Sequence, residues 1–242
     1  MRCITHIINF VVIEGLKEVN ILVDRIRAAI KFVRHSPSRL KRFKECVQRE
    51  MIESKKLLCL DVSTRWNSIY LMLDSSIKFE RAFERFVDCD PYFIKDLIDE
   101  RRPGVSIAFD WDNARKMVQV LENFFVLRIR ISRFLYVTSH DFFFHEINDV
   151  ECLLNEWITG IDFDLSVMGQ RMKEKYDKYW GDVKKMNMLI YIAVIIDPRH
   201  KLVFVEYSLK RLYRGEVGFK MTNLVKESMY EFFKDYCDRL RV

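Results

Sequence analysis

Hydrophobic residues recur at steps of three and four along most of the chain, a spacing typical of amphipathic helices. The 242 residues contain only 7 Gly and 4 Pro, which favours long helices over many short strands. We therefore predict an all-α fold. Residues 3–34 are predicted to form one or two helices, and the first long apolar stripe in them comprises Leu16, Val19, Val23, Ile26, Ile30 and Val33.

Breakers and polar residues divide this pattern into segments. Ser36-Pro37-Ser38 is predicted to end the first helical region, because a residue before proline avoids the α conformation. Residues 56–62 are short and apolar, so they predict an extended link or at most a brief strand. Thr64 or Asn67 is expected to cap a following helix that runs to about Val87. The next segment, 88–106, holds Pro91, Pro103, Gly104 and many charges, and is predicted to be a connection.

A second group of helices is predicted beyond this segment. Asp110 is expected to cap a long helix, and Gly160 to end a helix that follows an interruption at residues 138–141. The almost wholly apolar segment 186–196 is expected to be central. A final helix after Gly218 is predicted to be buried along one stripe. The inward positions expected in these helices are Trp111, Ala114, Val118, Leu121, Phe125; Ile147, Val150, Leu154, Trp157; Leu165, Met168, Met172, Tyr176, Tyr179; and Val225, Met229, Phe232, Tyr236, Leu240.

Positive charge is concentrated in one segment. The chain has a net charge of +6, whereas residues 25–49 alone carry nine Lys/Arg against one acid, Glu45. A concentrated patch of this kind is typical of proteins that bind a polyanion. A solvated helix face is the other interpretation, and the composition does not decide between them. The nine cations are Arg25, Arg27, Lys31, Arg34, Arg39, Lys41, Arg42, Lys44 and Arg49.

Several functional classes find no support in the sequence. The six cysteines form no Cys-x-x-Cys pair, which favours reduced thiols in an intracellular protein. No apolar run reaches the roughly 18 residues of a membrane span, so no membrane partner is expected. No phosphate-binding loop or hydrolase motif indicates a small-molecule substrate. Cys3 and His6 could offer two metal ligands, but a zinc site needs more, so a structural role is favoured and no metal site is predicted.

The string Thr64-Arg65-Trp66-Asn67 allows two interpretations. Trp66 is either a buried residue at the start of a helix, or an aromatic side chain that stacks on a nucleobase beside Arg65. Four blocks in order place this string in context. They are Arg2-Cys3-Ile4-Thr5-His6-Ile7-Ile8-Asn9; Ser36-Pro37-Ser38-Arg39 with Phe43-Lys44-Glu45-Cys46; Leu60-Asp61-Val62-Ser63-Thr64-Arg65-Trp66-Asn67-Ser68; and residues 168–180 with Ile196-Asp197-Pro198-Arg199-His200-Lys201.

With these blocks the chain resembles transposases of the hAT superfamily, in particular their RICESLEEPER-like branch, whose members carry BED zinc fingers. That family cuts DNA with an RNase H-like core in which three acids hold divalent metal ions such as Mg²⁺. The resemblance implies that all three acids lie outside this chain, so neither a catalytic residue nor a cofactor is expected in it. The expected fold is a multi-helix bundle corresponding to the family's helical insertion region.

The resemblance also implies a partner and a set of site residues. The expected partner is DNA, in the nucleus, and Cys3 and His6 become candidates for positions near the active centre. The expected divisions are 1–87, the tail of the core with the basic segment; 88–106, a connection; and 107–242, a helical region. The alternatives are a structural remnant that self-associates through exposed apolar faces and one part of a longer active transposase. The residues expected to bind DNA are Arg34, Arg39, Lys41, Arg42, Lys44, Arg65 and Trp66.

Overall fold

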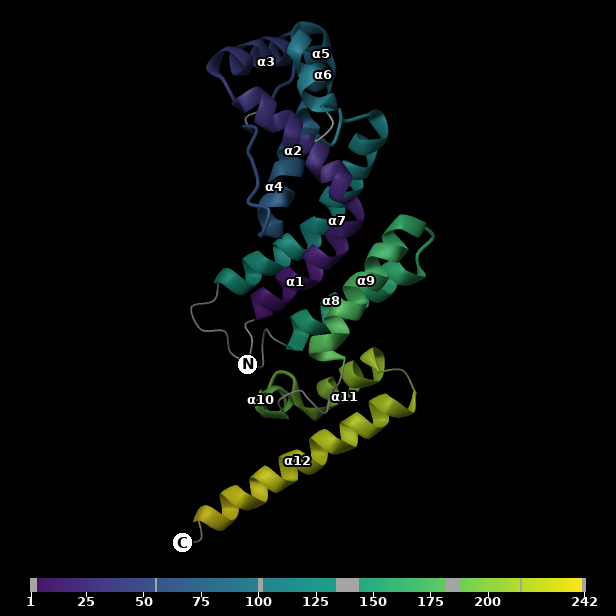
Figure 1. Ribbon diagram of the computed structural model, residues 1–242. Helices are drawn as coiled ribbons and strands as arrows, with labels where there is room; N and C mark the ends of the chain where they lie inside the picture. Colours follow the sequence, from purple (N-terminus) through teal and green to yellow (C-terminus); the bar gives the residue numbers. More distant parts are fainter. Residues whose placement is uncertain are drawn as a thin grey trace. The chain divides into compact units, whose positions relative to one another are not determined.

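The computed structural model describes residues 4–54, 56–99, 102–133, 144–181, 188–213 and 215–240, and in these residues it contains helices and no strand (Figure 1). This confirms the predicted all-α class, and the 56–62 segment forms no strand. The helices are α1 (Ile4–Leu16), η1 (Lys17–Val19), α2 (Asn20–Arg34), α3 (Pro37–Arg49), α4 (Trp66–Ser76), η2 (Ile77–Phe79), α5 (Glu80–Cys89), α6 (Pro91–Ile98), α7 (Ala108–Arg133), α8 (Phe144–Thr159), α9 (Phe163–Trp180), α10 (Met188–Ile196), α11 (Lys201–Leu212) and α12 (Glu216–Leu240).

The chain folds into two compact units. Unit 1 comprises Met1–Glu14 and Ile129–Val242, and unit 2 comprises Gly15–Arg128. Unit 2 is therefore one continuous stretch of sequence, while unit 1 combines the start of the chain with its second half. Among the described residues, no helix is both long and apolar enough to cross a membrane.

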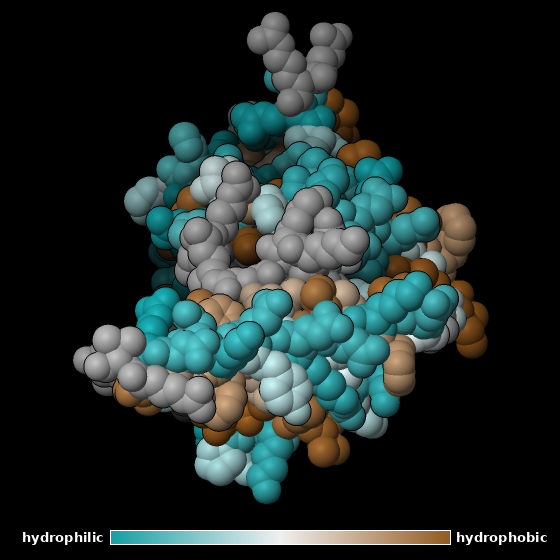
Figure 2. Space-filling model, turned by 90° about the horizontal axis from the view of Figure 1, so that it is seen from below, coloured by the Kyte–Doolittle hydropathy of each residue, from teal (hydrophilic) through white to brown (hydrophobic). Residues whose placement is uncertain are grey.

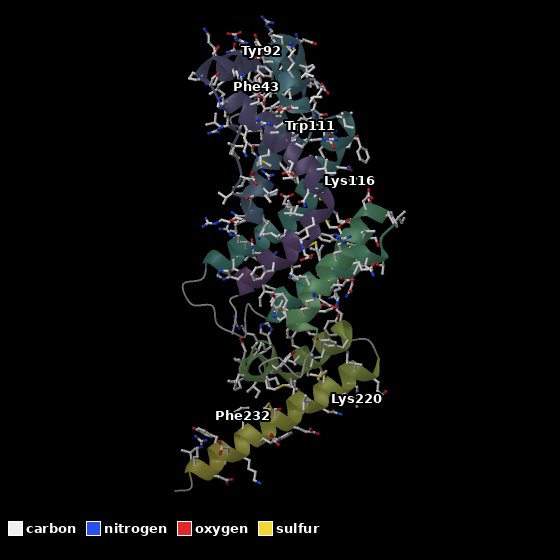
Figure 3. The ribbon with its side chains drawn as sticks, in the orientation of Figure 1. Phe43, Tyr92, Trp111, Lys116, Lys220 and Phe232 are labelled. Carbon is white, nitrogen blue, oxygen red and sulfur yellow. The ribbon has the colours of Figure 1, made fainter. Side chains whose placement is uncertain are left out.

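Aromatic side chains build the core of unit 2. Phe32 of α2 lies edge-on to Phe93 of α6, with ring centroids 5.2 Å apart. Phe43 of α3 packs against Phe83 of α5 at 4.7 Å, and Phe83 in turn stacks on Trp111 of α7 at 5.7 Å. Figure 3 labels Phe43 and Trp111 within this part of the molecule. Rings that meet at these distances and angles stabilise the packing of α2, α3, α5, α6 and α7 beyond the area they bury.

Local capping defines the start of α3 and α6. The Ser36 hydroxyl accepts a hydrogen bond from the Arg39 backbone N–H at 3.2 Å, and Pro37 occupies the first turn of α3, as expected for a proline at a helix start. The prediction that this tripeptide separates two helices is confirmed. Asp90 caps α6 in the same way, with Pro91 at the first position.

The segment 88–106 is more than the predicted connection. It contains α6, whose Phe93 and Leu97 are buried in the aromatic core of unit 2. Pro91 begins this helix instead of breaking it, because proline fits the first helical position, where its missing N–H costs nothing. Turn-forming residues alone therefore gave a misleading indication here.

Two helices have N-cap residues that differ from the predicted ones. Helix α4 begins at Trp66 with Arg65 as its N-cap, so neither Thr64 nor Asn67 caps it. Helix α7 begins at Ala108, and the Asp110 carboxylate reaches back to accept the Ile107 backbone N–H at 2.9 Å. Asp110 therefore satisfies a free donor at the helix start from inside the first turn.

Unit 1 contains two sets of packed helices. Helices α8 and α9 bury the predicted positions Ile147, Val150, Leu154, Met168 and Met172, and α8 ends at Thr159, directly before Gly160. Helices α10, α11 and α12 share a second core. The segment 186–196, expected to be central, contributes to this core as far as it is described, although Leu189 and Ile196 are exposed. The buried members of this core are Ile190, Tyr191, Val194, Val205, Leu209, Met221 and Val225.

The second half of α12 differs from the prediction. Val225 is buried, but Phe232, Tyr236 and Leu240, which were expected to face inward, are exposed. The helix also begins at Glu216, two residues before Gly218. The surface seen from the α12 side carries hydrophobic residues beside a hydrophilic band (Figure 2). The spacing predicted the stripe correctly, but nothing in the described part of the chain buries its last three members.

Candidate nucleic-acid interface

Two arginines of α2 are used to hold unit 2 together. Arg25 bonds the Asp110 carboxylate at 2.9 Å and the Pro103 carbonyl at 2.9 Å, so it ties α2 to the start of α7. Arg27 makes two hydrogen bonds, 2.8 and 2.7 Å long, to the carboxylate of Asp61, whose side chain is only 1% exposed. Hydrogen bonding to Asp61 raises the pKa of Arg27, and burial opposes it. The positive charges of Arg25 and Arg27 are therefore paired with acids inside unit 2.

Three more arginines of the basic segment also have internal partners. Arg34 donates to the Leu58 carbonyl, which holds the strand-free link between α3 and α4 against α2. The Arg39 guanidinium lies 3.7 Å from the centroid of the Phe32 ring, a cation–π contact. Arg42 pairs with Asp90 at 2.9 Å, although its side chain remains about half exposed at 46%. The charge of Arg42 is therefore partly available to solvent.

The remaining cations of α3 are different. Lys41, Lys44 and Arg49 are exposed, and none forms an ion pair within the described ranges. Helix α3 carries five Lys/Arg and a single acid, Glu45. Its buried side presents Phe43 and Cys46 to the core. Lys41 and Lys44 lie away from that side, and Arg49, one turn after Cys46, lies at its edge. We call Lys41, Lys44 and Arg49 the α3 cationic face.

Arg65 lies apart from this face. It is exposed and forms the N-cap of α4, and α4 is 11 residues, or about 16 Å, long. Figure 1 shows α3 beside α5 at one end of unit 2, whereas α4 begins towards the other end. The predicted DNA-binding residues therefore do not form a single patch, since Arg34, Arg39 and Arg42 are engaged and Arg65 is remote.

Trp66 adopts the first of its two interpretations. Its side chain is 2% exposed and lies edge-on to Phe124 of α7, with ring centroids 6.3 Å apart. A base can stack only on an accessible ring face, so in this conformation Trp66 offers none. The expectation that Trp66 contacts a base is therefore corrected by its burial: the residue anchors the start of α4 to the core of unit 2.

The other candidates lie in or near α1. His6 is exposed on α1, while Cys3 falls outside the described residues. Within the parts of the chain that the structure describes, no three His, Cys, Asp or Glu side chains group closely enough to hold a metal ion. The proposed place of Cys3 and His6 near an active centre stays a prediction.

The partners of the basic segment were missed by sequence reasoning. Asp61, Asp90 and Asp110 are each buried or have a buried side chain, and they neutralise Arg27, Arg42 and Arg25. They lie 34, 48 and 85 residues away from these arginines along the chain. A count of charges within a sequence window cannot detect pairs at such separations. No local feature of the sequence sets these acids apart, since Asp88 lies two residues from Asp90 and Asp112 two residues from Asp110.

Comparison with known proteins places the chain in a class. Residues 1–109 match the family model described as the ZBED1 RNase-like helical domain, and residues 141–236 match the model described as hAT-like transposase, RNase-H fold. The fold and both matches define a helical region of an RNase H-like transposase. No solved structure matches the chain.

Individual relatives agree with this class. The zinc finger BED domain-containing protein RICESLEEPER 2 of Oryza sativa subsp. japonica is 31% identical over 98% of this chain and 31% of its own length. RICESLEEPER 1 of the same plant is 30% identical over 98% of this chain and 31% of its own length. DAYSLEEPER of Arabidopsis thaliana is 29% identical over 81% of this chain and 26% of its own length. The chain belongs to the hAT transposase family, and it spans less than a third of the length of these relatives.

Proposed function

We propose that this chain supplies DNA-backbone contacts to a transposase-related protein of the nucleus, through the α3 cationic face. The observation that carries the proposal is the exposure of Lys41, Lys44 and Arg49 on one helix without ion pairs in the described part of the chain. Membership of a transposase family supports DNA as the polyanion. RICESLEEPER 2 is named for a BED zinc finger, which is consistent with a DNA partner.

The chemistry of this face favours phosphate over bases. Lysine ammonium groups neutralise phosphates and release condensed counterions, so affinity falls steeply as salt is raised. Such contacts position a protein on DNA but carry no sequence information. With Trp66 buried, stacking of a base on the ring of Trp66 adds nothing in this conformation. We therefore expect weak, salt-dependent binding with little sequence preference.

The test compares two variants of equal charge. Lys41→Ala/Lys44→Ala removes two cations from the α3 cationic face, and Lys178→Ala/Lys234→Ala removes two exposed cations from unit 1. Fluorescence anisotropy with a labelled duplex is measured between about 50 and 200 mM salt. The first variant should bind more weakly, with a slope of log K against log salt that is shallower by roughly two. The second should follow the wild type.

Two outcomes would contradict the proposal. One is wild-type protein that shows no binding at low salt, and the other is an equal loss in both variants, which would reflect net charge alone. We also propose that this chain does not cut DNA by itself, because the family resemblance implies that the three metal-binding acids lie outside it. Metal-dependent cleavage of a duplex by the purified chain would overturn that part. A fluorescent fusion that stays out of the nucleus would contradict the proposed location.

A second candidate function is self-association through α12. Phe232, Tyr236 and Leu240 form an exposed stripe at steps of four. The same stripe continues through the partly exposed Met229 to the buried Val225. Figure 3 labels Phe232 on this half of the helix. An apolar stripe at this spacing fits against a second helix. This candidate needs no nucleic acid, and it agrees with the alternative of a helical interaction protein or of one part of a longer transposase.

Sedimentation velocity distinguishes this candidate from a monomer. The wild type should show a concentration-dependent dimer, and Phe232→Glu/Tyr236→Glu should shift it to monomer. Lys234→Glu changes a charge on another side of α12 and serves as the control. A wild type that sediments as a monomer at all concentrations would remove the candidate without affecting the DNA-binding proposal.

A further inference from the structure

Two cysteines meet where α3 packs against α5. Cys46 lies near the end of α3 and is 1% exposed, and Cys89 is the last residue of α5 and is partly exposed. The ion pairs Arg42–Asp90 and Arg85–Glu50 join the two helices on either side of the cysteines, and neither thiol is in a disulfide. Helices α3 and α5 form the most extensive contact between helices in unit 2, so the packing of the core holds the pair together.

The two thiols have different surroundings. Burial, followed by the hydrogen bond with Cys89, raises the pKa of the Cys46 thiol to about 12, while Arg49 and Arg85 act in the opposite direction. Cys46 is therefore held as a neutral thiol inside the unit. Cys89, at the end of its helix, is the more exposed of the two residues. This division resembles that of a thiol pair in which one sulfur reacts first and the other resolves the product.

We propose that Cys46 and Cys89 form a redox-sensitive dithiol that low-molecular-weight disulfides convert into a disulfide bond between α3 and α5. The Cys89 thiolate attacks one sulfur of oxidised glutathione, forms a mixed disulfide and releases one glutathione thiolate. Cys46 then loses its proton to that thiolate or to water and attacks the Cys89 sulfur, which releases the second glutathione. Two protein thiols are oxidised, and one glutathione disulfide is reduced to two thiols.

Proximity makes the second step feasible. Few Cys46 thiols are ionised at neutral pH, which slows attack. A nucleophile already held beside its target gains a large effective concentration, which offsets this. In a reducing compartment the bond is expected to be transient, as for other intracellular disulfides. The dithiol lies on the buried side of α3, so the inference goes beyond the proposed function and stands whether or not the α3 cationic face binds DNA.

Peptide mapping of the folded, full chain tests the proposal. The protein is incubated with oxidised glutathione, remaining thiols are alkylated, and trypsin is added. The expected product is the peptide Glu45–Arg49 linked to the peptide Phe86–Lys95, and dithiothreitol should remove it. The oxidised protein should also unfold at a higher temperature than the reduced protein, because the bond constrains the unfolded chain.

Single variants separate the two roles. Cys46→Ser should trap glutathione on Cys89, whereas Cys89→Ser should leave Cys46 unmodified because it is buried. Cys59→Ser, which alters a thiol hydrogen-bonded to Ser75, should still form the link. Circular dichroism verifies that each variant is folded. The proposal is overturned if the linked peptides are absent from oxidised wild type, or if they form only after denaturation.

Discussion

Gly218 is the residue at which α12 can approach α11. A Cβ atom added at this position would lie 2.9 Å from the Leu209 carbonyl oxygen and closer still to that of Tyr213. Both are backbone atoms at the end of α11, so they cannot rotate away as a side chain would. The Thr222 hydroxyl donates to the Gly218 carbonyl at 3.0 Å, one turn further on. The contact between the two helices therefore depends on the missing side chain.

Gly218→Ala should destabilise unit 1. The added methyl forces the start of α12 away from α11 and loosens the core around Met221 and Val225, a cost of roughly 1–3 kcal/mol for overpacking. Urea unfolding followed by circular dichroism measures the change. Val217→Ala, at the exposed neighbouring position, serves as the control and should be nearly neutral. Equal stability of both variants would show that α12 does not need this close contact.

Glu146 is a buried acid with an incomplete set of partners. Its Oε1 atom lies 3.2 Å from Arg130, while its Oε2 atom is buried without a hydrogen bond. Burial raises the pKa of Glu146 above its ordinary value of 4.5; Arg130 opposes this, and Asp149 adds to it. The folded state therefore holds the proton more tightly than the unfolded state does.

This shift predicts a pH dependence of stability. The contribution of Glu146 is most favourable below its unfolded-state pKa near 4.5, and it is lost as the pH rises through the raised folded pKa. Glu146→Gln should remove that loss, so its stability relative to wild type should increase between about pH 4 and pH 7. Urea unfolding at several pH values measures the difference. Glu156→Gln, at an exposed position of α8, is the control; identical profiles for both variants would contradict the prediction.

Trp66 shows why single residues were hard to assign from sequence. Its neighbours Arg65 and Asn67 are equally compatible with a helix start and with a stacking platform. The deciding contact is Phe124, 58 residues further along the chain. Periodicity predicted the buried positions Trp111, Ala114 and Leu121 of α7, but it selected Phe125 instead of Phe124 and could not show which other helix they meet. Burial of a side chain depends on tertiary packing, and one sequence carries little information about that.

At the scale of elements, periodicity and helix-breaking residues predicted the positions of helices well. They did not predict which charged side chains are exposed and unpaired. The break at Ser36-Pro37-Ser38 and the end of α8 at Gly160 are local effects, and both were predicted. The pairing of Arg27 with Asp61 and of Arg42 with Asp90 is not local, so much of the basic segment was misjudged as free charge. The exposed half of α12 was also missed, because spacing defines a stripe but not its partner.

Asp90 joins α6 to α3, and its contribution to stability can be measured. Its carboxylate caps α6 through the Tyr92 N–H at 3.1 Å and pairs with Arg42 of α3 at 2.9 Å, and its side chain is 1% exposed. Asp90→Ala should remove the cap and leave Arg42 without its partner, with a loss of about 2 kcal/mol in the free energy of unfolding. The measurement is urea unfolding followed by circular dichroism. Asp88→Ala, two residues earlier and exposed, should change it little; equal effects would show that the cap and pair are dispensable.

At the scale of the whole molecule, the arrangement of the chain into units was not predicted. The expected boundaries at 87, 88–106 and 107 followed composition, whereas unit 2 extends from Gly15 to Arg128. Composition marks turns, but across them α6 packs on α2, and α7 packs on α4 and α5 through Phe124 and Trp111. Residues of α1 belong instead to unit 1, where Phe10 stacks on Tyr179 of α9 and Glu14 pairs with Lys175. Contacts between segments so far apart in the sequence cannot be predicted from local patterns along the chain.

Unit 2 is therefore expected to fold without the rest of the chain. It is one continuous segment of ordinary domain size, and its aromatic core, helix caps and ion pairs Arg25–Asp110, Arg27–Asp61 and Arg42–Asp90 are all internal to it. Residues 15–128, expressed alone, should give a helical circular dichroism spectrum and a cooperative thermal transition. Because this segment contains the α3 cationic face, it should also retain the salt-dependent DNA binding proposed for the full chain. A fragment that melts without cooperativity would show that unit 2 depends on unit 1, whereas a folded fragment that fails to bind DNA, beside a full chain that does, would place the interface outside α3.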